Sequence, residues 1–213
     1  RWKRCACPRP NISRLGVDGG GRSARRRLSV RIGQADVVAA MFFFLMVLIA
    51  ALFQFKIYAY MVAGAYVEDA LAASNLASAV IDVEEYGRNH NVRIGDTQNA
   101  FRIYRDALHY NLALDEEGYS AREELLAGRV QLQEYIVYNV LDQEVCITVY
   151  DGEGNCLCQE NARTGNVRTP DGVLVEHTTV YSRVRFQVKG LLGRSIDAEK
   201  EKSIDIVRCE SEE

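Results

Sequence analysis

Cysteine is the most reactive residue type in this chain. The 213 residues contain Cys5 and Cys7 near the beginning and Cys146, Cys156, Cys158 and Cys209 in the last third. In an oxidising compartment the last four can form up to two disulfides, with three connectivities. We expect a bridge from Cys156 or Cys158 to Cys209, with reduced, buried thiols as the alternative. A zinc site is not expected, because a Cys-x-Cys pair with isolated outliers lacks two well-spaced ligand pairs.

The register of the hairpin around these cysteines follows from the loop that we expect to close it. With Asp151–Gly154 as the loop, Tyr150 lies opposite Asn155, and Val149 lies opposite Cys156. Cys146 then points to the face opposite that of Cys156 and Cys158, so a bridge across the hairpin would need a bulge.

The other residues that could take part in catalysis or bind a metal form no recognisable site. His90, His109 and His177 have no motif around them, and no nucleophile-elbow, zinc-protease or phosphate-binding sequence occurs. Asp151-Gly-Glu-Gly-Asn155 resembles the start of a calcium loop, but Ala162 stands at the twelfth position, where a bidentate Glu is needed. We therefore expect a hairpin turn at Asp151, and we expect neither an enzyme nor a bound metal or cofactor.

Charge divides the chain into a basic head and an acidic body. Residues 1–33 contain ten Lys and Arg and one acid, so 16 of the chain's 26 basic residues and 28 of its 29 acids follow. A basic head can bind nucleic acid. We favour a topological reason instead, and predict a basic cytoplasmic leader over 1–33 that is disordered or cleaved.

An apolar segment begins immediately after this leader. Val37–Phe53 contains no charge, proline or glycine, and its roughly 17 residues reach the short end of a membrane span. Lys56 can extend its ammonium to the headgroups, and Tyr58, Tyr60 and Tyr66 fit an interfacial aromatic belt. The excess of Lys and Arg before the segment predicts a single pass, with the N-terminus in the cytoplasm and the body outside.

A removable signal peptide is the nearest alternative to a permanent span. Ala63-Gly-Ala65 is a plausible cleavage site, but the apolar core exceeds the usual 7–15 residues of a signal peptide and the helical pattern continues through the site. We predict a transmembrane helix and stalk over 34–86, with an alanine-rich face formed by Ala63, Ala70, Ala73 and Ala77. The alternative for this region is an ordinary helix that packs on its own domain.

The remaining residues, 87–213, are expected to form an extracytoplasmic α+β domain. After a polar loop over 87–95, Asp96 is expected to cap a helix with an apolar stripe at Phe101, Tyr104, Leu108 and Leu112. Ser120-Ala-Arg-Glu123 matches a capping box, which predicts a short helix that ends near Gly128.

Period-two alternation then predicts strands within an antiparallel sheet. The expected strands are 130–140, 145–150, 156–158, 180–189 and 204–207. In the first of them, Leu132, Ile136 and Tyr138 are expected to share one face. The fold class is therefore α+β: a long membrane-spanning helix that extends into a stalk, short helices, and an antiparallel sheet.

A resemblance to a known family rests on the start of this arrangement. Arg25-Arg-Arg-Leu-Ser-Val-Arg-Ile-Gly33, then Gln34-Ala-Asp-Val-Val38 and the apolar run, resemble type IV pilin-like proteins over roughly residues 25–85. Among these, the chain most resembles the TadE-like minor pilins (pseudopilins) of tight-adherence pilus systems. The resemblance implies that a prepilin peptidase cuts between Gly33 and Gln34. Family members usually carry an acid five residues after the cut; here that residue is Val38, and Asp36 is the nearest acid that could pair with a neighbouring subunit's N-terminus.

The resemblance also implies a function and partners. The expected function is a membrane-anchored minor pilin-like subunit that helps to assemble a tight-adherence-type pilus or secretion apparatus. Its partners would be the membrane, sister pilin-like subunits, the assembly machinery and the prepilin peptidase, and not nucleic acid. The alternative is a single-pass surface protein whose extracytoplasmic β domain binds a ligand or an adhesion target.

Overall fold

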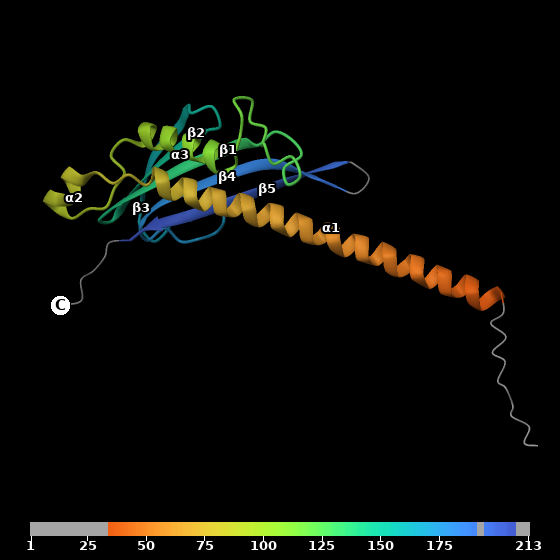
Figure 1. Ribbon diagram of the computed structural model, residues 1–213. Helices are drawn as coiled ribbons and strands as arrows, with labels where there is room; N and C mark the ends of the chain where they lie inside the picture. The colour runs from red at the N-terminus through yellow and green to blue at the C-terminus, as the bar shows by residue number, and fades with distance from the viewer. Residues whose placement is uncertain (1–33, 191–193, 208–213) are drawn as a thin grey trace, which may run out of the picture. The chain divides into compact units, whose positions relative to one another are not determined.

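The computed structural model describes residues 34–190 and 194–207, which form three helices and five strands (Figure 1). The helices are α1 (Gln34–Ser78), α2 (Val83–Asn89) and α3 (Thr97–Asn111). The strands are β1 (Gln131–Leu141), β2 (Glu144–Asp151), β3 (Cys156–Arg163), β4 (Thr178–Lys189) and β5 (Ser195–Ile206). This element order confirms the α+β class with a long N-terminal helix, short helices and an antiparallel sheet.

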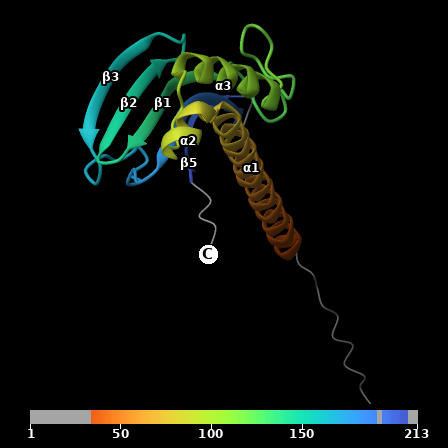
Figure 2. The same ribbon diagram turned by 90° about the vertical axis from the view of Figure 1, so that its left-hand side faces the viewer.

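The five strands form one antiparallel sheet in the order β3-β2-β1-β4-β5. Strands β1, β2 and β3 follow one another as hairpins, and the chain then returns to place β4 on the other side of β1. Figure 2 shows α3 and the C-terminal part of α1 on the same side of this sheet. On the other face, Val167 and Val175 of the β3–β4 connection pack against Ile136, Tyr138, Val145 and Tyr181.

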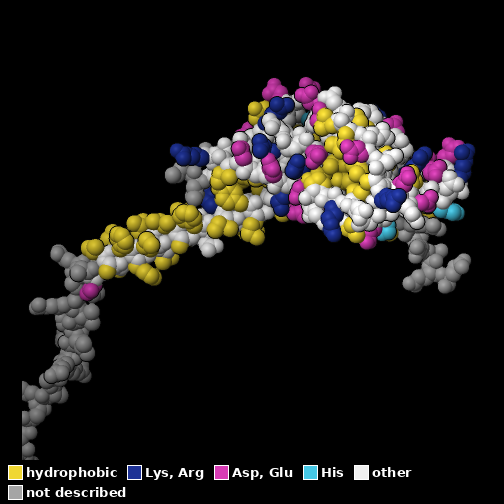
Figure 3. All heavy atoms as spheres, turned by 180° about the vertical axis from the view of Figure 1, so that it is seen from behind, with side chains coloured by type: hydrophobic (Ala, Val, Ile, Leu, Met, Phe, Trp, Pro, Cys, Tyr) yellow, Lys and Arg dark blue, Asp and Glu magenta, His cyan; other side chains and the backbone are white. Residues whose placement is uncertain are grey.

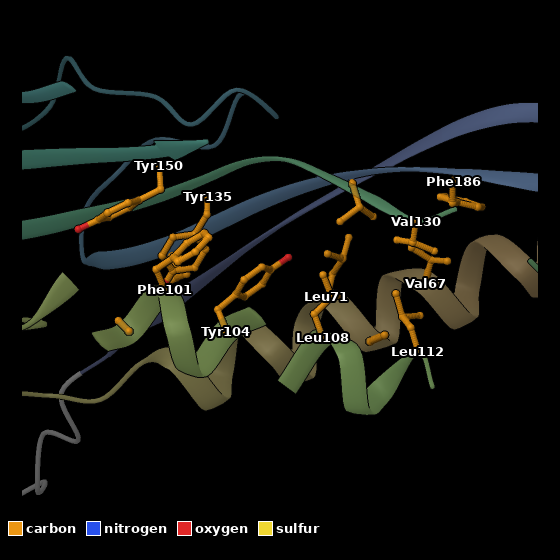
Figure 4. Close-up of a cluster of buried hydrophobic side chains, with 14 of the residues drawn as sticks. Val67, Leu71, Phe101, Tyr104, Leu108, Leu112, Val130, Tyr135, Tyr150 and Phe186 are labelled. Atoms are coloured by element: carbon orange, nitrogen blue, oxygen red, sulfur yellow. The ribbon is translucent and has the colours of Figure 1, made fainter. Parts of the chain in front are cut away.

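The main core lies between the sheet and the helices. Residues 46–78 of α1 belong to the same compact unit as the sheet. Fully buried Val67 and Leu71 of α1 meet Tyr104 and Leu108 of α3 and Phe186 of β4 in this core (Figure 4). Burial of such side chains contributes about 1.5–3 kcal/mol each, so this interface fixes the C-terminal part of α1 on the sheet.

Helix α3 forms as its sequence predicts. The Asp96 carboxylate accepts a hydrogen bond from the Asn99 N–H at 2.8 Å, which satisfies a free amide of the first turn. Phe101, Tyr104 and Leu108, together with the capping residue Leu112, are buried. Phe101 stacks on Tyr150 with ring centroids 5.4 Å apart, which links α3 to β2.

Two local predictions about the connecting segments are wrong. No helix follows Ser120, whose hydroxyl donates to Leu112 O at 2.7 Å and accepts from the Arg122 N–H at 3.2 Å, the bond of a local turn and not the Glu123 N–H bond of a capping box. Conversely, α2 occupies part of the expected polar loop. Its start is capped by Asp82, whose carboxylate accepts from the Glu85 N–H at 3.1 Å. Helix α2 buries no side chain, so no apolar periodicity marks it in the sequence.

The expected faces of β1 also need correction. Its pairing with β4 shifts register between Leu132 and Glu134, so that Gln133 is an extra residue, as in a β-bulge. Leu132 therefore packs with the main core on the helix side, whereas Ile136 and Tyr138 belong to the cluster on the opposite face. An uninterrupted period of two had placed these three residues together.

Candidate functional site: the apolar segment of the first helix

The apolar segment, Val37–Phe53, is exposed along its whole length in this chain. The most exposed of its large side chains are Met41 at 69%, Phe43 at 72% and Phe44 at 70%. Figure 3 shows hydrophobic side chains covering the visible face of this part of α1. An apolar surface of this size on a folded protein marks contact with lipid or with another protein.

Length and composition make this segment suitable for a lipid bilayer. Among residues 34–190 and 194–207, α1 is the one helix long and apolar enough to cross a membrane. At 1.5 Å per residue, Val37–Phe53 spans about 26 Å, and continuation to Tyr58 brings the length to about 33 Å. A hydrocarbon core is about 30 Å thick. A helix that is apolar around its whole circumference has no face suited to water.

The surroundings of α1 change near Tyr60. From there on, buried residues recur at helical spacing on the side that packs against the sheet, whereas Ala65, Asp69 and Leu76 remain exposed. The buried set is Ala63, Val67, Ala70, Leu71, Ser74, Asn75 and Ser78. Ala63 and Ala70 of the expected alanine-rich face thus pack on the protein's own domain, which was the alternative for this region, whereas Ala73 and Ala77 are exposed.

Polar contacts align this packed part of α1 with β5. The Glu68 carboxylate bonds Lys202 Nζ at 2.9 Å and Lys200 Nζ at 3.2 Å. The hydrogen bond from Lys202, then that from Lys200, and the positive charges of both lysines lower the pKa of Glu68. About two turns further along, Asn75 Nδ2 donates to Lys202 O at 2.8 Å. These contacts join residues that are 127, 132 and 134 positions apart in the chain, so sequence periodicity could not reveal them.

The three tyrosines of the expected aromatic belt differ in their surroundings. Tyr58 is 67% exposed, whereas Tyr60 packs against the main core. Tyr66 donates its hydroxyl proton to Asn111 O at 2.8 Å, and the Arg122 guanidinium lies 4.9 Å from its ring centroid. Tyr66 is therefore part of the folded domain, and Tyr58 has the exposure that a membrane-interface side chain needs.

The expected processing site lies at the start of the described chain. Gly33 is outside the described residues, and Gln34 is the first residue of α1. Asp36 lies in the first helical turn with an exposed side chain. A carboxylate in this turn interacts favourably with the helix dipole. Cleavage after Gly33 and pairing of Asp36 with another subunit stay predictions.

The expected register of the cysteine hairpin is wrong by one residue at Tyr150 and by two residues from Val149 on. Tyr150 pairs with Cys156 and Val149 pairs with Cys158, so Leu157 is the extra residue of a bulge. Cys146 consequently shares the face of Tyr150 and Cys156. However, Cys146 lies four positions along β2 from Tyr150, the partner of Cys156, which is a distance of about 13 Å along the strand. The described thiols Cys146, Cys156 and Cys158 are all free.

The disulfide expectation for Cys209 stays a prediction, because this residue lies outside the described residues. The sheet order bears on it, however. Cys156 and Cys158 belong to β3 at one edge of the sheet, and β5, the last strand before Cys209, forms the opposite edge.

The remaining candidate residues have structural roles in the described chain. Asp151 forms the expected turn, and its carboxylate accepts N–H bonds from Glu153 at 2.9 Å and Asn155 at 2.8 Å. Hydrogen bonds from Asn155 lower the pKa of Asp151. His90 ends α2 in a left-handed conformation, with φ 58°. His109 lies in the last turn of α3, and His177 immediately precedes β4.

No protein family, no curated protein and no solved structure matches this chain. The class of protein therefore rests on the geometry. The described residues form an α+β protein with one long apolar helix near the N-terminus, followed by a five-stranded antiparallel sheet. This arrangement is compatible with a single-pass membrane protein.

Proposed function

We propose that this protein is a membrane-anchored minor pilin-like subunit that takes part in assembling a tight-adherence-type pilus or secretion apparatus. The observation that carries the proposal is the change of surroundings along α1. One uninterrupted helix has an exposed, wholly apolar segment, Val37–Phe53, and a C-terminal part that packs against an antiparallel sheet. A subunit of this design can lie in the bilayer and can also pack its apolar half against the same half of a neighbour.

In this proposal the function is physical and not catalytic. The basic leader holds the N-terminus in the cytoplasm, and the apolar segment crosses the membrane with the sheet domain outside. The prepilin peptidase removes the leader at Gly33, and Asp36 lies near the new N-terminus. Sister subunits then contact the aromatic and small side chains of the apolar segment through close helix packing.

In-cell photo-crosslinking tests the assembly step. A photoreactive phenylalanine at Phe43 should link the protein to other small anchored subunits in cells that naturally make it. The same group at Leu76, which is 65% exposed on the packed half of α1, serves as the matched control. Links from Leu76 but not from Phe43 would contradict assembly through the apolar segment.

N-terminal sequencing of the cellular protein tests the processing step. The expected first residue is Gln34. An intact leader in cells that possess the peptidase would remove cleavage from the proposal, while leaving membrane anchoring to be judged by extraction.

An open cleft in the sheet domain favours a second candidate, a single-pass surface protein with a ligand-binding β domain. The cleft has a volume of about 420 Å³, and its lining includes Arg105, His109, Arg129 and Glu153. A helix exchange separates the two candidates. A protein that works with an unrelated membrane span in place of Val37–Phe53 is a binding module, whereas a pilin-like subunit loses its function.

A further inference from the structure

The cleft of the sheet domain lies where the C-terminal half of α3 meets the start of β1. Its volume of about 420 Å³ is within the range of small-ligand sites, about 300–1,000 Å³. The buried side chains of Leu108 and Val130, labelled in Figure 4, contribute to its apolar lining. Two loops complete its walls: residues 114–118, which follow α3, and the turn between β2 and β3.

Glycines hold both loops close to the backbone of β1. A Cβ at Gly152 would overlap Leu132 O, and a Cβ at Gly118, where φ is +87°, would lie 3.1 Å from Val130 O. The loop after α3 is fixed further by Asp115, whose carboxylate accepts two backbone N–H bonds from its own loop. The walls of the cleft are therefore formed before a ligand binds, which lowers the entropic cost of binding.

Charged side chains of both signs line this cleft without pairing with one another. Arg105 and Arg129 supply positive charge, and Glu116, Glu117 and Glu153 supply negative charge. In the part of the chain that the structure describes, none of these five side chains has an ion pair or a hydrogen bond. Elsewhere on the same domain, arginines do pair with glutamates. The charges of the cleft are thus available to a ligand that carries both signs.

The other lining residues decide between classes of ligand. Gln131 and Gln133 present exposed amides, which donate and accept hydrogen bonds as a peptide group does. Among the described residues that line the cleft there is no aromatic side chain on which a nucleobase could stack, and the glutamates repel a polyanion. A peptide provides matching groups: backbone amides for the glutamines, and charged side chains for the arginines and glutamates.

A second cleft extends the site along α3. It has a volume of about 330 Å³ and shares Arg105 and Glu153 with the first cleft. Together the two clefts follow α3 from Gln98 to His109, about 17 Å at 1.5 Å per residue. An extended peptide covers this length with about five residues, at 3.3 Å each.

We infer that the two clefts form a binding site for a linear peptide of about five residues that carries both an acidic and a basic side chain. The acidic side chain pairs with Arg105 and Arg129, and the basic side chain pairs with the glutamates of the two loops. This site gives the second candidate function its class of ligand, and it does not depend on insertion of α1 into a membrane.

An array of pentapeptides with varied side chains tests this specificity, with the full chain purified in detergent. The best-bound peptides should carry at least one Asp or Glu and at least one Lys or Arg, and binding should weaken at high salt. Enrichment of one sign of charge alone, binding without preference for charge, or no binding would overturn the inference.

Fluorescence anisotropy with the best-bound peptide then tests whether the cleft is the site. R105Q/R129Q should lower the affinity about tenfold, equivalent to about 1.4 kcal/mol, as expected for the loss of two exposed ion pairs. The matched control R163Q/K189Q removes the same charge at exposed positions outside both clefts and should leave the affinity unchanged. Unchanged affinity in R105Q/R129Q, or an equal loss in the control, would overturn the assignment of the site.

Reversal of charge provides a gain that a merely unfolded variant cannot show. On the array, R105E/R129E should select peptides whose charged side chains are all basic, because every charge of the cleft is then negative. Retention of the original preference would contradict the pairing with the two arginines. Membrane extraction should give the same result for all of these variants, so failure of peptide binding leaves the proposed membrane anchoring intact.

Discussion

Replacement of Leu45 and Leu48 by arginine tests whether the apolar segment is seated in lipid. Both side chains lie near the middle of Val37–Phe53 and are 49% and 47% exposed. At a span centre, a leucine contributes about −0.5 kcal/mol to insertion, whereas an arginine costs about 2.5–3.5 kcal/mol. Each replacement therefore makes insertion about 3–4 kcal/mol less favourable.

This cost can be compared with the insertion free energy that the segment itself contributes. Its eleven Val, Leu, Ile and Phe residues contribute roughly −3 to −7 kcal/mol on the same scale. One arginine therefore brings the free energy of insertion close to zero. Two arginines, at a combined cost of about 6–8 kcal/mol, make it unfavourable. We expect L45R to be partly membrane-integrated and L45R/L48R to be released.

Extraction of membranes with alkaline carbonate measures the outcome. The matched control is Leu76→Arg, because Leu76 lies in the same helix and is 65% exposed, but follows the point where α1 joins the sheet domain. This control should remain as firmly integrated as the unchanged protein. Recovery of L45R/L48R in the membrane fraction, or of the unchanged protein in the soluble fraction, would refute the assignment of this segment to lipid.

Three further changes test the fold that holds the helix in place. Leu71→Ala should lower the free energy of unfolding by about 2–5 kcal/mol in denaturant titration, because Leu71 is fully buried between α1 and the sheet, whereas Leu76→Ala should have little effect. Glu68→Gln should cost about 0.5–1 kcal/mol at neutral pH, since its ion pairs with Lys200 and Lys202 are partly exposed. Because the pKa of Glu68 is lowered from its ordinary 4.5, this contribution is complete above that pH and is lost as the pH falls through the lowered value. If E68Q and the unchanged protein lost the same amount of unfolding free energy at acidic pH, the pairing would be contradicted. Gly154→Ala should destabilise the hairpin by about 1–3 kcal/mol in thermal unfolding, because φ is +92° and a Cβ would lie 2.6 Å from Phe101 Cε1; no loss of stability would show that the turn can adopt another conformation.

The sequence predicted those elements whose burial is periodic and local. The stripe of α3 repeats at helical spacing and its cap precedes it directly, so both Asp96 and Leu108 could be assigned. In β4, Val184, Phe186 and Val188 alternate with polar residues, and the structure buries them as expected. Such patterns survive folding because each residue's surroundings depend mainly on its neighbours in the same element.

The predictions failed where contacts across the chain decide the structure. The bulges at Gln133 and Leu157 each add one residue, and after such an addition every later side chain changes face. No turn motif in the sequence marks these positions. Only the pairing with a neighbouring strand shows which residue is left without a partner.

Strand β5 was predicted only at its end because its sequence is highly charged. Its acids Asp197, Glu199 and Glu201 alternate with Ala198, Lys200 and Lys202. The alternation is regular, but both faces are polar when lysine is counted as a surface residue. The structure explains the pattern, because Lys200 and Lys202 face α1 and pair with Glu68, while Glu199 and Glu201 bond Arg185 and Tyr181.

The point where α1 changes partners also argues for two environments and not for one extended soluble core. Within Val37–Phe53 the helix is apolar on all sides, with no polar residue to meet water. After Tyr60 it carries a buried face and an exposed face with Asp69. On the buried face the hydroxyls of Ser74 and Ser78 donate to carbonyls of the helix, and the side-chain N–H of Asn75 donates to Lys202 O. A helix designed for water throughout would keep one polar face along its whole length. The loss of that face in Val37–Phe53, within an unbroken helix, is accounted for if lipid or the same segment of a neighbouring subunit surrounds it on every side.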